Sequence, residues 1–232
     1  VKEILTDALS IYTIDRELIR QLNPDVIITQ AQCEVCAVSL KEVEQALEDL
    51  LDKECRIISL QPNTLSDVYK EISEVAAILN ASSQADDLHK RAEERTEIIR
   101  HKLKFLSENP KVACIEWLAP LMIAGNWTPE LIQIAGGDPI LAVNGKHSVF
   151  IDFQNIRNAD PDIIVVMPCG FSIPRTLQEI NLLLDLPGWK DLKAVKNNRI
   201  YIADGNQYFN RSGPRLTESI EILAEIINPK QF

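Results

Sequence analysis

The sequence predicts an α/β protein with two lobes, each built on a mainly parallel sheet, joined by one long rigid helix. A helix–turn–strand pattern occurs twice, at residues 15–28 and 152–166, and a long polar helical pattern lies between the two copies. Each copy has a short amphipathic helix, a turn containing Pro-Asp, and an apolar run typical of a strand. Two related lobes imply a cleft between them, which favours a binding function over a single catalytic core.

Residues 1–80 form the predicted N-terminal lobe. Its expected elements are helix 15–22, strand 25–29, a loop with cysteines, helix 40–52, strand 55–60 and a helix to residue 79 capped by Thr64. Two strands alone make a marginal sheet. We therefore expect the first lobe to be incomplete at its N-terminus or to be completed by a partner.

Residues 81–109 form the predicted linker helix. Ser83 is the expected N-cap, with Asp86 three residues later, as in a capping box. The helix is expected to end at Asn109, because Pro110 cannot continue it. Its apolar positions make a narrow stripe and the rest is charged, which is typical of a solvated helix that bridges lobes. So stiff a linker predicts only small lobe closure.

Residues 110–232 form the predicted C-terminal lobe. Its expected elements are strand 112–116, helix 129–135, the second copy of the repeat, helix 175–184, strand 199–203 and helix 215–227. Strands that alternate with helices predict a mainly parallel sheet with right-handed crossovers.

Composition excludes several classes of function. The chain has 232 residues, 46% of them hydrophobic, and a formal net charge of −10. A negative protein is a poor partner for nucleic acid or for an anionic membrane surface, and no apolar run is long enough to cross a bilayer. No phosphate-binding loop, His-rich metal motif or Ser/His/Asp combination is present, so the sequence predicts a binding protein that is not an enzyme and requires no cofactor.

Four segments resemble the cobalamin-binding branch of the ABC-transporter solute-binding proteins, the vitamin B12-binding type of class III periplasmic binding protein. They are residues 22–39, 116–127, 168–171 and 204–215, and the resemblance extends over essentially the whole chain. It implies two α/β lobes joined by a rigid helix, a corrinoid in the cleft, and delivery to a membrane permease. It also implies a periplasmic or cell-surface location, although the cysteines favour the cytoplasm and leave the compartment open.

A corrin ring is a wide, mostly apolar disc fringed with amides, so its site needs flat apolar faces and a few hydrogen-bonding groups. The apolar candidates are Trp117, Leu118, Pro120, Met122, Trp127 and Phe171. Trp127 fits the core of the lobe equally well. A second group follows the last strand, where open α/β sheets bind ligands: Gln207, Tyr208, Phe209 and Arg211. The resemblance places Gln207 and Arg211 against the ligand; a pairing of Arg211 with a neighbouring carboxylate is the alternative.

The resemblance also concerns permease docking. Related proteins place an exposed glutamate on each lobe to meet arginines of the permease. The second-lobe position falls at Gln154, which is uncharged, and Glu42 is the nearest candidate on the first lobe. Docking through salt bridges is therefore less well supported than ligand binding.

Three cysteines form the sharpest chemical pattern. Cys33 and Cys36 make a CxxC pair, and Cys169 follows the corresponding strand of the second copy. Thiolates here could bind a metal or the corrinoid cobalt, could act as a redox pair, or could simply line the loops. Two alternatives to a corrinoid binder stay open: a heme, siderophore or metal-chelate binder on the same fold, and a thiol-dependent metal or redox protein using these cysteines.

Overall fold

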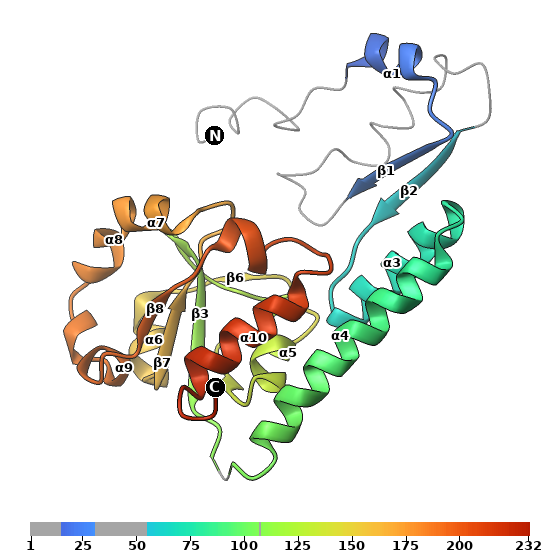
Figure 1. Ribbon diagram of the computed structural model, residues 1–232. Helices are drawn as coiled ribbons and strands as arrows, with labels where there is room; N and C mark the ends of the chain where they lie inside the picture. Colours follow the sequence, from blue (N-terminus) through green and yellow to red (C-terminus); the bar gives the residue numbers. More distant parts are fainter. Residues whose placement is uncertain (1–14, 31–54, 107) are drawn as a thin grey trace. The chain divides into compact units, whose positions relative to one another are not determined.

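The computed structural model describes residues 15–30, 55–106 and 108–232, and its residue contacts divide the chain into two units, Val1–Pro62 and Asn63–Phe232 (Figure 1). Helices α3 (Leu65–Ile78) and α4 (Ser82–Leu103) belong to the second unit. The sequence places the boundary of the first lobe after residue 80 instead. The division into 1–80, 81–109 and 110–232 therefore stays a prediction.

The first unit contains the predicted first copy of the repeat. Helix α1 (Arg16–Leu22) is followed by strand β1 (Val26–Gln30), which pairs in parallel with β2 (Arg56–Leu60). The α1 helix begins at Asp15, whose carboxylate accepts a hydrogen bond of 2.9 Å from the backbone N–H of Leu18. The predicted helix 40–52 lies outside the described residues.

The two copies of the repeat have the same local structure. Helices α1 and α6 (Phe153–Ala159) both end at a left-handed residue, Asn23 with φ 41° and Asp160 with φ 44°. The N–H of each donates to the carbonyl four residues earlier, on Ile19 or Ile156, at 2.9 Å. Asn and Asp adopt this conformation more readily than most residues. In both copies Pro-Asp and a strand follow, β1 in the first and β7 (Ile163–Val166) in the second.

The second unit is built on one mixed sheet of six strands. Its strand order is β6 (Val149–Phe150), β4 (Leu121–Ile123), β3 (Lys111–Leu118), β7 and β8 (Ile200–Ile202), with β5 (Asp138–Pro139) paired to β3. Strands β3, β7 and β8 are parallel as predicted, whereas β4 and β6 are antiparallel. The sequence missed β4 and β6 because strands of two or three residues are too short to show a period.

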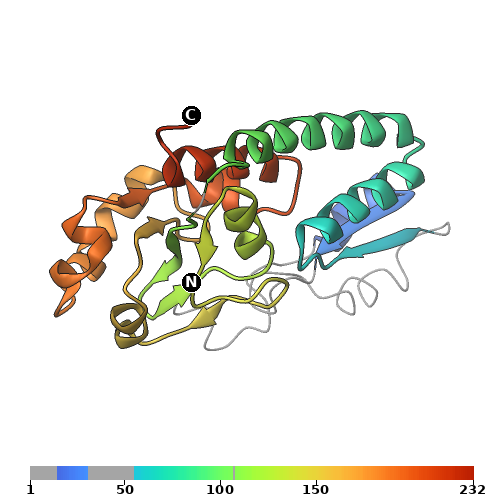
Figure 2. The ribbon, with the colours of Figure 1, turned by 90° about the horizontal axis from the view of Figure 1, so that it is seen from below.

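Helices cover both faces of this sheet, and the strand alternation separates two cores. On β3, Val112 and Cys114 point into one core, while Ala113 and Ile115 point into the other. The first core is closed by α5 (Thr128–Ile134) and α10 (Leu216–Ile227), and the second includes Ile156 of α6. Figure 2 shows α10 on one side of the sheet and α6 on the other. The remaining helices are α7 (Ile173–Glu179), α8 (Asn181–Leu184), η2 (Trp189–Asp191), α9 (Lys193–Lys196) and η3 (Gly205–Phe209).

The long helix α4 packs against α3 and α10 within the second unit. Ala85, Ala92, Thr96 and Ile99 form its buried stripe, and Arg95 donates to both carboxylate oxygens of Glu221 on α10 at 2.7 and 2.5 Å. The helix begins after Ala81 without a side-chain cap and ends at Leu103, so the predicted capping box at Ser83 and the end at Asn109 are wrong. None of the described helices combines the length and the apolar character that a membrane span requires.

The capping box at the start of α3 makes stability depend on pH. Thr64 caps α3 as predicted, and the Asp67 carboxylate accepts from the N–H groups of Thr64 and Asn63 at 2.8 and 3.0 Å. The hydrogen bond with the Thr64 side chain and these two backbone bonds lower the pKa of Asp67. A lowered pKa stabilises the fold above the unfolded-state pKa, about 3.9, and this contribution is lost as the pH falls below it.

We therefore expect Asp67→Asn to lower the free energy of unfolding by roughly 0.5–2 kcal/mol at pH 7, and by less at pH 3. Urea denaturation of both proteins at the two pH values measures the difference. An equal deficit at pH 7 and pH 3 would show that the carboxylate charge does not contribute.

Candidate functional site

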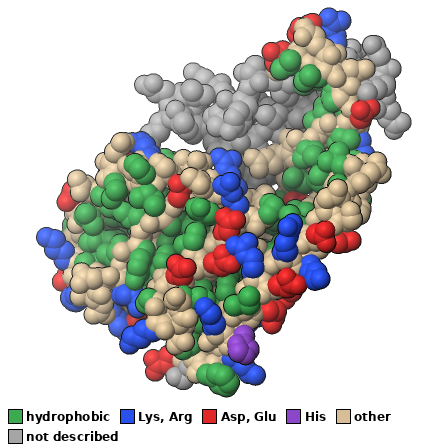
Figure 3. Space-filling view, in the orientation of Figure 1, with side chains coloured by type: hydrophobic (Ala, Val, Ile, Leu, Met, Phe, Trp, Pro, Cys, Tyr) green, Lys and Arg blue, Asp and Glu red, His purple; other side chains and the backbone are tan. Residues whose placement is uncertain are grey.

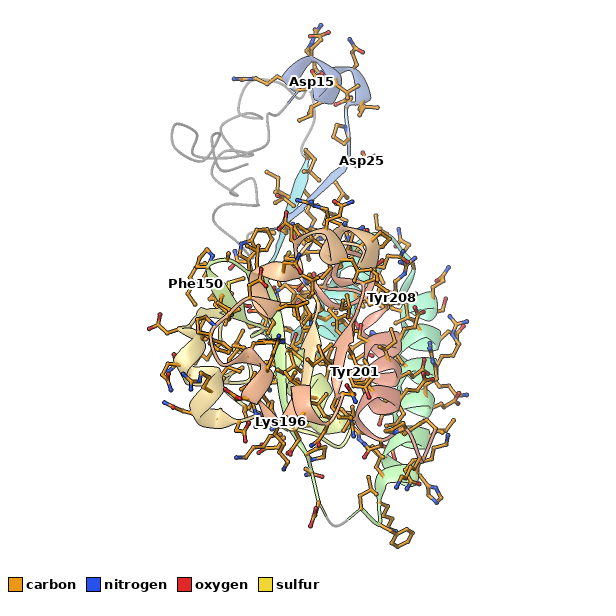
Figure 4. All side chains as sticks on the ribbon, turned by 90° about the vertical axis from the view of Figure 1, so that its left-hand side faces the viewer. Asp15, Asp25, Phe150, Lys196, Tyr201 and Tyr208 are labelled. Carbon is orange, nitrogen blue, oxygen red and sulfur yellow. The ribbon has the colours of Figure 1, made fainter. Side chains whose placement is uncertain are left out.

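The carboxyl ends of β3, β7 and β8 meet at one edge of the sheet in the second unit. Open α/β sheets bind ligands at this edge. Two hydrogen bonds tie the segments that follow the strands: Cys169 N–H donates to the Glu116 carbonyl at 3.0 Å, and Asn206 N–H donates to the Phe171 carbonyl at 3.1 Å. In Figure 4, Phe150 and Tyr208 lie toward this end of the unit, and Lys196 lies toward the opposite end.

An apolar surface lies at this edge. The rings of Trp117 and Phe171 meet edge to face, with centroids 5.3 Å apart and planes at 62°. Trp117 is paired with Met122 on β4, and Met122 is paired with Phe150 on β6, so these three side chains project on one side of the sheet. Phe150 is 66% exposed. We call these four residues the aromatic face.

Further exposed apolar side chains adjoin the aromatic face beyond Phe171. Helix α7, which begins two residues after Phe171, leaves Ile173 and Leu177 42% and 54% exposed. Figure 3 shows hydrophobic side chains gathered over this part of the second unit. Singly exposed apolar residues are normal, whereas larger contiguous apolar surfaces mark binding regions.

Polar groups border the aromatic face on the side of η3. Arg211 donates from its guanidinium to the carbonyl and to the side-chain oxygen of Asn206 at 2.7 and 2.8 Å. The backbone N–H of Asn206 also donates to the Phe171 carbonyl. Arg211 and the exposed Gln207 are therefore held beside the rings of Trp117 and Phe171. Among the described residues Arg211 forms no ion pair with a carboxylate. The predicted alternative pairing of Arg211 is therefore not observed there.

Arg175 borders Phe171 as a second cation. Its guanidinium carbon lies 4.9 Å from the centre of the Phe171 ring. The same guanidinium binds Glu179 and Gln178 on α7, so its charge is already compensated. Arg175 therefore packs on the Phe171 ring, and its charge is not free to bind a ligand.

Three of the predicted ligand-contact residues are buried in the second unit. Trp127 and Phe209 are 5% and 0% exposed, and the Trp127 indole N–H donates to the Phe209 carbonyl at 2.9 Å. Leu118 is 5% exposed and belongs to the core on the other face of the sheet. All three pack in cores of the second unit: Trp127 and Phe209 in the core under α5 and α10, and Leu118, at the end of β3, in the core on the other face. Trp117, Met122, Phe171, Gln207 and Arg211 do lie together, and Pro120 is exposed.

Tyr208 takes an intermediate position. It is half-buried against the core, and its carbonyl accepts from the Ser219 hydroxyl at 2.9 Å. Phe150 was missed by the sequence reasoning because the strand that carries it has only two residues.

The predicted metal and docking residues fall mostly outside the described part of the chain. Cys33, Cys36 and Glu42 lie outside the described residues. Cys169 is exposed next to the aromatic face, and no cluster of three or more His, Cys, Asp or Glu side chains occurs in residues 15–30, 55–106 and 108–232. Gln154 lies on α6 and donates to Asn158 at 2.7 Å. The thiolate and docking hypotheses therefore stay predictions.

Two ionisable groups on β3 have shifted pKa values. Burial raises the pKa of the Cys114 thiol to about 12, with a smaller contribution from the charge of Glu116. The Cys114 thiol is therefore neutral at physiological pH and acts as a small apolar side chain. Burial also raises the pKa of Glu116, although a hydrogen bond with Ser148 acts in the opposite direction.

Gly205 lets η3 approach the segment that follows β7. A Cβ at this position would meet the Pro168 carbonyl and would lie 2.6 Å from the Met167 carbonyl, both rigid backbone atoms. We expect Gly205→Ala to lower the free energy of unfolding by about 1–3 kcal/mol. Gly213→Ala is the matched control, because no heavy atom lies within 4 Å of its Cβ. Chemical denaturation of both variants tests this, and equal losses would contradict the close approach.

A separate hollow of about 340 Å³ lies at the opposite edge of the sheet, near the amino end of β8. It is lined by Leu184, Trp189, Lys190, Val195, Asn198 and Ile200. It shares no residue with the aromatic face. This hollow is a useful reference region for ligand experiments.

Comparisons with known proteins agree with this architecture. A model of the periplasmic binding protein family matches residues 4–206. The chain is 26% identical over 144 residues to the Staphylococcus aureus (strain MRSA252) protein named high-affinity heme uptake system protein IsdE, a match that covers 60% of the chain and 49% of that protein. The chain thus spans about half the length of such relatives.

Solved structures share the fold at low sequence identity. An ABC transporter substrate-binding protein from Listeria monocytogenes EGD-e has a TM-score of 0.78 at 19% identity, covering 93% of this chain and 81% of that one. S. aureus IsdE complexed with heme has a TM-score of 0.73 at 20% identity and the same coverage. The predicted two-lobed α/β class is confirmed, and these neighbours are binding proteins rather than enzymes. The chain belongs to the periplasmic binding protein family.

Proposed function

We propose that this protein binds a corrinoid, vitamin B12 or a relative, on the aromatic face of its second unit. The observation that carries the proposal is the combination of two meeting rings, Trp117 and Phe171, with hydrogen-bonding groups fixed beside them. A flat, mostly apolar disc gains from burial against such rings, while its amide fringe needs donors such as Gln207 and Arg211.

The role that fits this ligand is that of a solute-binding component of an ABC transporter. The family match and the structural neighbours support that role. On this proposal the protein works in the periplasm or at the cell surface, passes the ligand to a permease, and needs no cofactor besides the ligand it carries. A net charge of −10 is consistent with a soluble carrier of a small molecule.

Heme is the second candidate, because one of the relatives named above, S. aureus IsdE, is named a heme uptake protein and has a structure complexed with heme. Heme is also a flat tetrapyrrole and would stack on the same rings. The two ligands differ at the rim, since heme carries two carboxylates and a corrinoid carries neutral amides and a phosphate. The polar groups around the aromatic face therefore decide between them.

Calorimetric titration of this chain with cyanocobalamin and, separately, with hemin tests the proposal. We expect cyanocobalamin to bind with a dissociation constant in the micromolar range or lower, and more tightly than hemin. Tighter binding of hemin would replace the corrinoid by heme. If neither ligand binds, the chain is not a tetrapyrrole binder, and the iron-chelate and thiol alternatives come first.

A further inference from the structure

Glu116 is an acidic residue at the carboxyl edge of the sheet and is not among the ligand contacts proposed above. It lies near the carboxyl end of β3, directly before Trp117, where the pairing of β3 with β4 shifts register. Its carbonyl accepts from Cys169 N–H at 3.0 Å, which ties it to the loop that carries Phe171. The backbone of Glu116 is therefore held next to the aromatic face.

The side chain of Glu116 is fixed by Ser148. The Ser148 hydroxyl oxygen accepts a hydrogen bond from Gly125 N–H at 3.0 Å. The hydroxyl proton of Ser148 is therefore free to be donated to Oε2 of the Glu116 carboxylate. A Cβ on Gly125 would meet the Lys146 carbonyl and would lie 2.6 Å from Ser148 N, so this loop lies directly over Gly125. The missing Cβ of Gly125 therefore leaves room for the loop that carries Ser148.

The carboxylate is left without a cation and with an unused acceptor. Among the described residues Glu116 forms no ion pair, and only Oε2 takes part in a hydrogen bond. Oε1 is not fully buried and has no hydrogen-bond partner among the described residues. A partly desolvated carboxylate without a counter-charge is unfavourable unless donors reach it. Such groups mark functional sites when they lie beside a binding surface.

We propose that Glu116 determines which tetrapyrrole is bound, by accepting hydrogen bonds from the side-chain amides of a corrinoid and repelling the carboxylates of heme. The inference rests on the proposed function and specifies its ligand class. An amide N–H₂ donates to an ionised carboxylate more strongly than to a neutral acceptor. A second carboxylate close to Glu116 is disfavoured by like charge in a partly desolvated site.

The test compares Glu116→Gln with the wild type by titration with cyanocobalamin and with hemin. Glutamine has nearly the same shape but no charge. We expect cyanocobalamin binding to weaken by about tenfold or more and hemin binding to strengthen or stay equal, so that the ratio of the two dissociation constants shifts toward hemin. Glu225→Gln, which removes the same charge from an exposed position on α10, should leave both constants unchanged.

A folding defect is separated from this effect by thermal unfolding. Because the charge of Glu116 is partly desolvated and unpaired, Glu116→Gln should unfold at the wild-type temperature or above it. Ser148→Ala keeps the charge and loosens its position, so it should weaken cyanocobalamin binding less than Glu116→Gln does.

Different results would overturn the role of Glu116 and the proposed function. If the wild type binds cyanocobalamin and Glu116→Gln keeps the wild-type ratio of dissociation constants, the role of Glu116 is overturned and the proposed function stands. If the wild type does not bind cyanocobalamin, the proposed function is overturned and the role of Glu116 with it.

Discussion

Trp117→Ala is expected to weaken cyanocobalamin binding about 30-fold while leaving the fold intact. A tryptophan side chain buries roughly 150–250 Å² when fully covered. Covering even half of that area contributes about 2 kcal/mol at about 25 cal/mol per Å², which corresponds to roughly a 30-fold change in affinity. Trp117 also packs against the Phe171 ring, so its truncation removes the larger of the two rings and a packing partner of the other. Calorimetric titration of the variant measures the loss.

Phe105→Ala is the matched control for Trp117→Ala. Phe105 is an aromatic residue that is 87% exposed and lies beyond the end of α4. Its removal should change neither the affinity nor the unfolding temperature. Wild-type affinity of Trp117→Ala would show that the ligand does not contact the aromatic face.

Trp127→Ala is expected to destabilise the protein by about 3–5 kcal/mol, the usual range for truncating a buried aromatic residue. Trp127 is 5% exposed, and its indole N–H donates to the Phe209 carbonyl at 2.9 Å. The substitution therefore opens a cavity and also leaves a buried carbonyl without its donor. Urea denaturation measures the change in the free energy of unfolding.

Trp127→Phe separates the two effects of Trp127→Ala. It keeps most of the volume and removes only the indole donor, so the loss should fall to about 1–3 kcal/mol. Wild-type stability of Trp127→Ala combined with a large loss of ligand affinity would contradict the core assignment and make Trp127 a ligand contact.

The sequence predicted the regular elements well because their patterns are long enough to read. The repeated helix–turn–strand unit is an example: Asn23 and Asp160 close both helices in the same left-handed conformation. The apolar stripe of α4 was also predicted, whereas the first and last residues of the helix were not. Its first turn lacks a side-chain cap, so Ser83 gave a misleading signal.

The site was only partly predictable, because burial at irregular strand ends and at the starts of helices has no period. Trp117 and Trp127 occur in similar Pro- and Gly-containing surroundings, yet one lies on the aromatic face and the other is in the core. Trp117 lies on β3 beyond a register shift, and Trp127 lies directly before α5, so the burial of each depends on tertiary packing. Glu116 did carry a signal that was not used: it is a single acid in the apolar strand Lys111–Leu118.

The choice between corrinoid and heme shows what a family match leaves open. Both ligands would stack on Trp117 and Phe171, so the shared fold does not separate them. The local resemblance of residues 204–215 favours a corrinoid, and the names of the relatives favour heme. The charge of the groups at the rim is a property of this chain itself, and on our proposal Glu116 is the residue that decides.

Hydrogen–deuterium exchange of the chain, with and without saturating cyanocobalamin, tests the central claim most directly. If the ligand lies on the aromatic face, exchange should slow in residues 116–122, 169–175 and 206–211, while the hollow lined by Leu184, Trp189 and Ile200 stays unchanged. Slower exchange around that hollow, with no change in the three segments, would contradict the assignment of the binding site.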